Sequence, residues 1–319
     1  MTPRRLRVVW VLAAAGCAGA LPARAPAPRD PSATSGEPVT GCEGCHAAIA
    51  TEWQSSFHRT AFVDGTYQAS LALEESKEHA FCNRCHDAAA TRAGVGAGVD
   101  CISCHGSSAH RTPKTNAASG SCATCHEFTF DDGRPELVQK TVTEHAASDF
   151  AAVTCAECHM EDSNGHKDHR FLSGHTPERI GRALQIRVTR GEKESSLHIS
   201  IQSSAGHAFP TGDMFRRARL VLFAEGARGE IVANAERTFG RTWGGVRVGQ
   251  HAGARTEVSD TRIRGSWQED VELETPTAPI THVRWSIVYE RVIAIRGAQV
   301  TLASSDVVAE GELEWKLAR

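Results

Sequence analysis

The 319-residue sequence predicts two regions of different fold class: an α-plus-irregular region with little strand over residues 41–180, then an all-β, sandwich-like region over residues 181–319. Two observations carry this prediction. Ten of the eleven cysteines lie between Cys42 and Cys158, in a stretch rich in Ala and Gly. After Gly181 no cysteine follows, and apolar residues alternate with polar ones at a period of two, which is typical of half-buried strands.

Composition limits the classes of function. The chain has 35 basic and 38 acidic residues, and this balance argues against a nucleic-acid-binding protein, which needs a basic face. Only 40% of the residues are hydrophobic, below the usual share of roughly 45–50%. The sequence contains no apolar run of about 18 residues, the length of a membrane-spanning helix. We therefore expect a thin side-chain core, no nucleic-acid partner and no conventional membrane span.

Residues 1–16 have the order of a secretory signal peptide: three arginines, an apolar run, then small residues. The segment that ends at Cys17 resembles a lipobox, although Ala14 stands where Leu is usual. Ordinary cleavage, after Ala20 or after residues 23–25, is the alternative. We expect an exported protein of a bacterium, either periplasmic or held at the outer membrane or cell surface by lipidation of Cys17.

Residues 17–40 are expected to form a lipid-anchored linker. Five prolines are spaced among Ala, Ser, Thr and Gly, and such a composition stays extended because it buries too little surface to fold. A segment of this kind suits a tether between a lipid anchor in the membrane and a folded body.

Five copies of one motif, C-x-x-C-H, follow the linker. This is the attachment motif of c-type haem: two thiols on one helical turn form thioethers to the macrocycle, and the next imidazole lies beneath the iron. The sequence therefore predicts five covalent haem c groups. Their thioether positions are Cys42, Cys45, Cys82, Cys85, Cys101, Cys104, Cys122, Cys125, Cys155 and Cys158. Their proximal iron ligands are His46, His86, His105, His126 and His159.

Other uses of paired cysteines fit less well. Structural zinc sites combine C-x-x-C units in twos, and five units leave one without a partner. Disulfides would not explain a histidine after every pair. Five macrocycles would also supply the apolar volume that the composition lacks, so we expect the chain without haem to be largely unfolded.

Further pieces surround the motifs. They are Trp53–His58 after the first motif, Gly98–Asp100 before the third and His110 after it, Glu144–His145 before the fifth, Asp168–Phe171 and Gly174–His175 after it, and Gly206–Gly212. Together these pieces, over about 42–215, resemble multihaem cytochromes of the cytochrome c-552/c-554 type, which are related in motif arrangement to hydroxylamine oxidoreductase and the octahaem reductases. The last piece resembles a GHxFPTG signature that opens a β-rich domain in some of these proteins.

The resemblance also implies distal iron ligands, on the face of each haem opposite the proximal histidine. It assigns this role to His58, His110, His145, His207 and one of His169 and His175, and it leaves the choice between the last two open. His166 lies in a polar stretch, and we expect it to be solvated.

The second region carries the alternation expected of a β-sandwich. Strands are predicted at residues 184–188, 197–201, 220–224, 281–292 and 300–303. No nucleophile–base pair, metal cluster or phosphate-binding loop stands out among them. We expect this region to donate His207 to a haem, to shield one end of the haem array and to dock a partner.

Three classes of function are open. If both axial positions of every iron are filled, the protein can only carry electrons between other redox proteins, and the surplus of histidines favours this carrier. A reductase or dehydrogenase of a small nitrogen or sulfur compound needs one iron with an open distal position. A structural or adhesive surface lipoprotein is the third class. We favour the carrier, assign no catalytic residue and leave enzymatic activity open.

Overall fold

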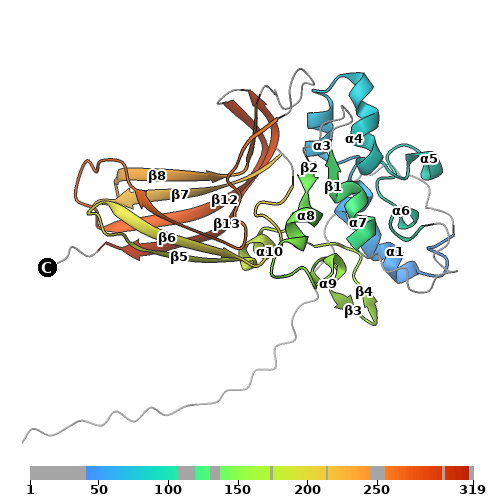
Figure 1. Cartoon of the computed structure of the whole chain (residues 1–319), viewed down its shortest axis with the longest axis horizontal. Coiled ribbons are helices and arrows are strands. Elements are labelled where there is room, and N and C mark those ends of the chain that lie inside the picture. Colours follow the sequence, from blue (N-terminus) through green and yellow to red (C-terminus); the bar gives the residue numbers. More distant parts are fainter. Residues whose placement is uncertain are drawn as a thin grey trace, which may run out of the picture. The chain divides into compact units, whose positions relative to one another are not determined.

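The computed structural model describes residues 41–106, 119–129, 137–172, 175–212, 215–244, 256–296 and 299–315 (Figure 1). The expected signal peptide, the linker with Cys17, and His110 lie outside these residues. The described residues belong to one compact unit, Gly36–Arg319, and the boundary expected after residue 180 stays a prediction.

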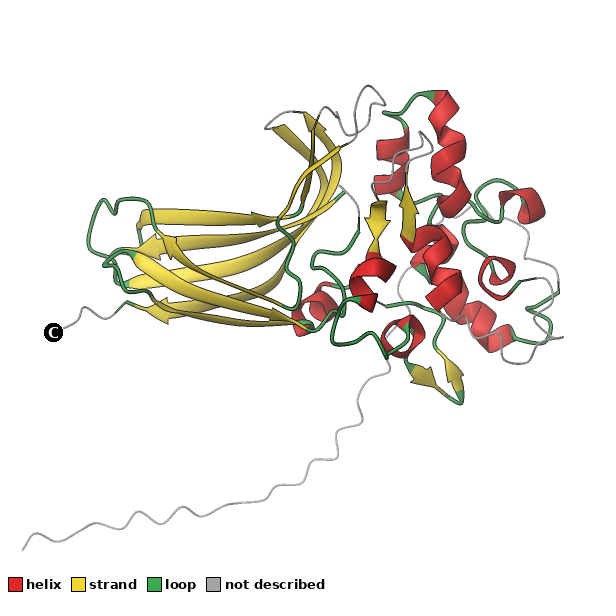
Figure 2. Ribbon diagram, viewed as in Figure 1, coloured by secondary structure: helices red, strands yellow, loops and turns green. Residues whose placement is uncertain are grey.

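Short helices dominate the first part of the chain (Figure 2). They are α1 (Ala47–Gln54), α2 (Phe57–Thr60), α3 (Gly65–Leu71), the 3₁₀ turn η1 (Ser76–Glu78), α4 (His79–His86), α5 (Ala90–Ala93), α6 (Cys101–His105), α7 (Ser119–His126), α8 (Thr141–Ala146), α9 (Cys155–His159) and α10 (Pro177–Arg182). Two small hairpins join them: β1 (Glu127–Thr129) with β2 (Leu137–Lys140), and β3 (Asp162–Ser163) with β4 (His166–Lys167). Isolated helices shorter than about 12 residues are marginal in water, so these helices depend on what they pack against.

Strands dominate after α10. They are β5 (Leu184–Arg190), β6 (Ser196–Ser203), β7 (Arg216–Glu225), β8 (Ile231–Phe239), β9 (Arg241–Gly244), β10 (Thr256–Asp260), β11 (Ser266–Glu272), β12 (His282–Arg296) and β13 (Gln299–Glu314). Two antiparallel sheets result, with strand orders β11-β6-β5 and β13-β12-β7-β8, and β9 pairs with β10 in a separate hairpin. The register sets Val188 opposite Ile199 in the first sheet and Leu222 opposite Trp285 in the second.

One apolar core fills the space between the two sheets. Alternate residues of β6, Leu197, Ile199 and Ile201, are fully buried and pack in the same cluster as Leu222 of β7 and Ile287 of β12. Every buried member of this cluster lies between Ile180 and Trp315. The β region therefore has the packing of a sandwich and owns a side-chain core.

The helical region has no comparable core among its described residues. Its large buried apolar side chains are Trp53, Leu71, Val138, Met160 and Ile180, and the last, on α10, packs into the core of the β region. A small second cluster joins Val138 to Trp243 of the β9–β10 hairpin. In the described part of the chain, no helix has both the length and the apolar character needed to cross a membrane.

The expected change from helices to strands is observed, and each predicted strand matches one in the structure. Four strands of the β region were not predicted, namely β8, β9, β10 and β11, and neither were the short strands β1–β4 of the helical region. The pattern of β11 shows why: only Trp267 and Val271 of its seven residues are apolar, since the other face of this edge strand meets solvent. β13 also extends from the predicted 300–303 to Gln299–Glu314, because its polar residues pair with β12 along their whole length.

Candidate haem-binding site

Each C-x-x-C-H motif forms a helical turn. The first closes with a hydrogen bond from His46 N–H to Cys42 O at 2.9 Å, and the others lie in α4, α6, α7 and α9. Local capping explains two of these turns. Asp100 accepts Ser103 N–H at 2.8 Å to start α6, and Thr154 forms a capping box with Glu157 to start α9. The thiols and imidazole of each motif are thereby brought to one side of the turn.

All five motifs line one cavity of about 1850 Å³. The five proximal histidines border it, as do thiols of every motif. So do the distal candidates within the described residues, which are His58, His145, His169, His175 and His207. The structure thus collects on one cavity side chains that are up to 165 positions apart in the sequence, from Cys42 to His207.

Three proximal histidines face a distal candidate across this cavity. His105 faces His169 with ring centroids 6.2 Å apart, and His159 faces His207 at 6.2 Å. His126 faces His58 at 6.4 Å. The paired planes differ by 29°, 6° and 75° respectively.

These separations fit an iron between two imidazoles. A metal–nitrogen bond of about 2.0 Å plus about 1.1 Å from nitrogen to ring centre, counted on both sides, gives about 6.2 Å. Direct stacking would bring the rings closer, as Phe57 and His175 show with centroids 3.7 Å apart. The gap between the three histidine pairs therefore matches the space that a six-coordinate haem iron requires.

Hydrogen bonds engage Nδ1 in three of the cavity-lining imidazoles. Nδ1 of His169 donates to Lys167 O at 2.6 Å, and Nδ1 of His86 donates to Ala61 O at 3.2 Å. Nδ1 of His207 donates to Thr211 Oγ1 at 2.6 Å, because that hydroxyl itself donates to Ala208 O at 2.9 Å. Such contacts fix the tautomer and orientation of an imidazole whose other nitrogen binds a metal.

Burial favours the neutral form of three distal candidates, which is the form that binds iron. Burial and then the neighbouring His126 lower the pKa of His58 to about 4. Burial lowers the pKa of His207 to about 4, and burial with Arg216 nearby does the same for His175. Nδ1 of His58 is also buried with no hydrogen-bond partner among the described residues, so this ring has a nitrogen free for a ligand.

The backbone around Gly98 explains how His58 is held. Gly98 has φ +71°, and a Cβ there would lie 2.6 Å from His58 O. This close approach lets Val99 N–H donate to His58 O at 2.9 Å, while Trp53 Nε1 donates to Val99 O at 2.8 Å. The segments Trp53–His58 and Gly98–Asp100 therefore pack against each other and are joined by these hydrogen bonds.

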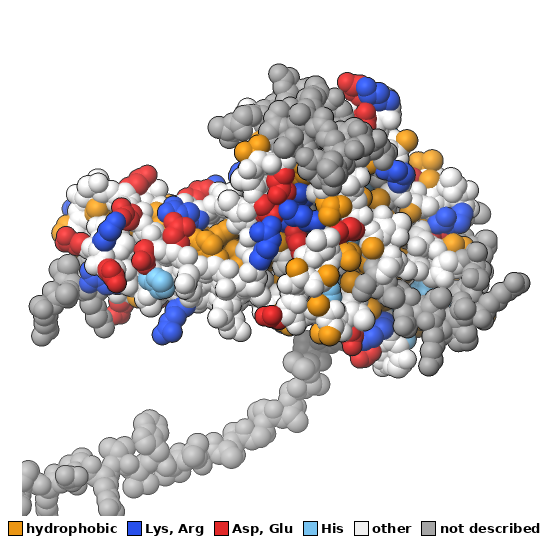
Figure 3. Space-filling model, viewed as in Figure 1, with side chains coloured by type: hydrophobic (Ala, Val, Ile, Leu, Met, Phe, Trp, Pro, Cys, Tyr) orange, Lys and Arg blue, Asp and Glu red, His pale blue; other side chains and the backbone are white. Residues whose placement is uncertain are grey.

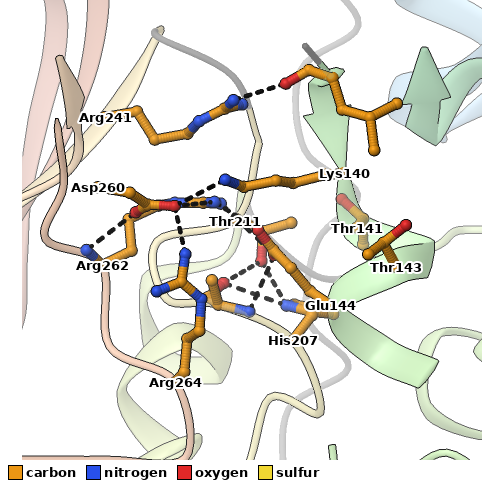
Figure 4. Close-up of polar contacts among 12 residues, drawn as sticks. Lys140, Thr141, Thr143, Glu144, His207, Thr211, Arg241, Asp260, Arg262 and Arg264 are labelled. Carbon is orange, nitrogen blue, oxygen red and sulfur yellow. Dashed lines mark hydrogen bonds and ion pairs between the residues drawn. The ribbon is translucent and has the colours of Figure 1, made fainter. Parts of the chain in front are cut away.

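A buried charge network holds the segments of His145 and His207 together (Figure 4). Arg262 pairs with Glu144 and with Asp260, whose Oδ2 lies 2.9 Å from the guanidinium. The side chains of Arg262, Glu144 and Asp260 are 1%, 5% and 7% exposed. Glu144 directly precedes His145 and accepts Ala208 N–H at 3.1 Å, next to His207. One carboxylate thus connects the two histidine segments.

Contacts between motifs centre on α7. Thiols of different motifs lie close enough to shift each other's pKa in the pairs Cys85–Cys125, Cys42–Cys101 and Cys122–Cys155. Ser121 of α7 also donates to Cys104 O at 2.9 Å. The fourth motif therefore adjoins the second, third and fifth, and the first adjoins the third.

The remaining candidates have different surroundings. His145 lies beside Gly206, 3.6 Å from the position that a Cβ there would take, and His175 stacks on Phe57. Both border the cavity, and their irons stay unassigned. The expectation that His166 is solvated is wrong, because its half-buried Nε2 forms a hydrogen bond with the Glu52 carboxylate at 3.1 Å. Sequence reasoning also missed Arg262 and Asp260, whose only signal is a charged run between two strands.

The comparisons support the fold. The solved structure of a penta-haem cytochrome c552 from Thermochromatium tepidum aligns with a TM-score of 0.67 and 19% identity, over 86% of this chain and 97% of that chain. MtrC from Shewanella baltica OS185 aligns with a TM-score of only 0.17 at 15% identity, over 72% of this chain and 44% of that chain, and carries no argument. No protein-family model matches the sequence, and no curated protein matches it.

Proposed function

We propose that this chain, which shares its fold with a penta-haem cytochrome, is an exported pentahaem c-type cytochrome that transfers electrons between other redox proteins. The observation that carries the proposal is the set of three histidine pairs separated by 6.2–6.4 Å, on a cavity bordered by all five C-x-x-C-H motifs. Bound haem supplies one-electron redox chemistry, and two axial imidazoles per iron leave no position for a substrate.

Different residues of the chain would attach each haem and ligate its iron. Ten cysteines hold the macrocycles by thioethers, and the five motif histidines are the proximal ligands. His169, His58 and His207 would be the distal ligands for the third, fourth and fifth motifs, and the distal ligands for the first two would come from among His110, His145 and His175. Haem carries carboxylate groups, and cavity-lining guanidinium groups are suited to bind them. These belong to Arg84, Arg92, Arg179, Arg182 and Arg216.

The arrangement around α7 favours a central position for the fourth haem. Its motif adjoins three others, so the electron route branches there instead of following the order of the motifs in the sequence. On the face shown in Figure 3, basic and acidic side chains are interspersed, which suits transient protein partners better than a nucleic acid. Cys17 would tether the chain to a membrane.

Haem counting and EPR spectroscopy of the oxidised, purified protein test the proposal. We expect the mass of five haems on the chain and five low-spin irons. Perpendicular imidazoles leave the two iron orbitals that they contact nearly equal in energy, so the 75° pair His58–His126 should give a large-gmax signal. The 6° pair His159–His207 should give an ordinary rhombic one.

The enzymatic alternative makes the opposite prediction. A high-spin iron that binds cyanide, nitrite or hydroxylamine, with a spectral change equal to one haem, would replace the carrier by a reductase or dehydrogenase. A count of four haems or fewer would remove the pentahaem assignment itself. Mass spectrometry of the mature chain tests the lipid anchor, because a mature chain that begins after Cys17 cannot be lipidated at that residue.

A further inference from the structure

Tyr67, one of two tyrosines in the sequence, lies flat on the imidazole of His86 in the second motif. The ring centroids are 3.8 Å apart and the planes differ by 6°. The phenol hydroxyl donates to Asn83 Oδ1 at 2.5 Å. Asn83 and His86 are three positions apart on α4 and so share a side of that helix, which lets one tyrosine contact both.

Tyr67 is itself held in place. Asp64 caps α3, and its Oδ1 accepts Tyr67 N–H at 2.9 Å. Just before this cap, Ala61 O accepts the hydrogen bond from His86 Nδ1 at 3.2 Å. Residues 61–67 therefore meet the imidazole twice, with a carbonyl at its edge and an aromatic ring on its face. The edge contact fixes the tautomer, and the stacked ring restricts rotation of the imidazole plane.

We propose that Tyr67 is a positioning residue for the haem of the second motif, which fixes the plane of the His86 imidazole and covers one face of that ligand. The proposal rests on haem binding at this motif, as proposed above. Contacts behind a metal ligand orient it and tune the metal, and the apolar cover of a site controls its solvent access and reduction potential. Removing the ring would admit water, which stabilises the more highly charged ferric state and lowers the potential.

Two substitutions at Tyr67 separate the ring from its hydroxyl. Tyr67→Leu removes the stacked ring, whereas Tyr67→Phe keeps it and removes only the hydrogen bond to Asn83. Phe62→Leu is the matched control, because it removes an aromatic ring that neighbours Tyr67, with centroids 6.1 Å apart, and keeps the Tyr67 ring that stacks on His86. Each haem-loaded variant is measured by haem count, EPR spectroscopy and a spectroelectrochemical titration.

In Tyr67→Leu we expect five haems, a change in the g values of one haem and a downward shift of one of five midpoint potentials. Tyr67→Phe and Phe62→Leu should keep the wild-type values. An unchanged spectrum and unchanged potentials in Tyr67→Leu would overturn the proposal, as would loss of one haem, since Tyr67 would then act in attachment. If Tyr67→Leu does not fold, Tyr67→Trp decides: it keeps a stacked ring, and a shifted potential there would contradict us. Failure of the proposed function differs from all these results, because wild-type protein itself would then lack five haems.

Discussion

Arg262→Met tests the buried network that joins the His145 and His207 segments. The substitution keeps the length of the side chain and removes its charge, so Glu144 and Asp260 lose a shared partner at a site where all three side chains are at most 7% exposed. Removing one member of a buried ion pair costs about 3–5 kcal/mol of unfolding free energy. Ala208 N–H still binds Glu144, and Lys140 still lies 3.1 Å from Asp260, so we expect the lower end, about 3 kcal/mol.

The assay is equilibrium unfolding of the haem-loaded protein in guanidinium chloride, followed by far-UV circular dichroism. Arg284→Met is the control, because Arg284 pairs with Glu225 in the same β region but is 58% exposed, and such pairs contribute about 0–1 kcal/mol. The double variant Arg262→Met with Glu144→Met should recover part of the loss, since the buried Glu144 carboxylate is then no longer left without its charged partner, while Asp260 keeps Lys140. Equal midpoints for Arg262→Met and Arg284→Met would refute the reasoning.

Three further predictions follow from the same geometry. His207→Ala should convert one of five haems to a high-spin or ligand-binding form in the EPR and absorption spectra, whereas His198→Ala, at an exposed position beside Asp270, should leave all five unchanged. Burial alone would raise the pKa of Asp260, but Arg262 and Lys140 hold it well below its usual 3.8. This carboxylate therefore contributes stability above about pH 4 that is lost as the pH falls through the folded-state pKa. Asp260→Asn should lower the unfolding free energy at pH 7, and its difference from wild type should shrink when unfolding is measured at increasingly acid pH. The sequence led us to expect a largely unfolded chain without haem, but the β region owns a side-chain core. A variant with all ten motif cysteines changed to Ala should therefore lose hydrogen-exchange protection in α1–α9 but keep it in β6, β7 and β12. Equal loss in both regions would contradict this.

The sequence predicted what is encoded locally. C-x-x-C-H requires one helical turn, and each described motif forms one. The alternation at Leu197, Ile199 and Ile201 predicted β6 because a buried face repeats every second residue. The piece Gly206–Gly212 drew attention to His207, and the hydrogen bond of Thr211 to its imidazole gives that pattern a physical reason.

Pairings between distant segments could not be predicted. His58 and His126 are 68 positions apart, and His105 and His169 are 64 apart. The residues around each histidine do not indicate which other histidine lies opposite it. The choice between His169 and His175 stayed open for this reason, and the ring opposite His105 now favours His169 there. The contact of Arg262 with Glu144 spans 118 positions and was equally hidden. β11 was not predicted because only two of its residues are apolar, and its place in the sheet depends on pairing with β6, which is distant in the sequence.

The loop that carries His207 has a consequence for the order of assembly. It leaves β6 in one sheet and enters β7 in the other, so its two ends are fixed only when both sheets exist. The motif of His159 lies 48 positions earlier in the sequence, so it emerges from synthesis before its opposite imidazole is available. The iron at the fifth motif would then receive its second ligand only when the sandwich closes, and its spin state would report that both sheets have formed.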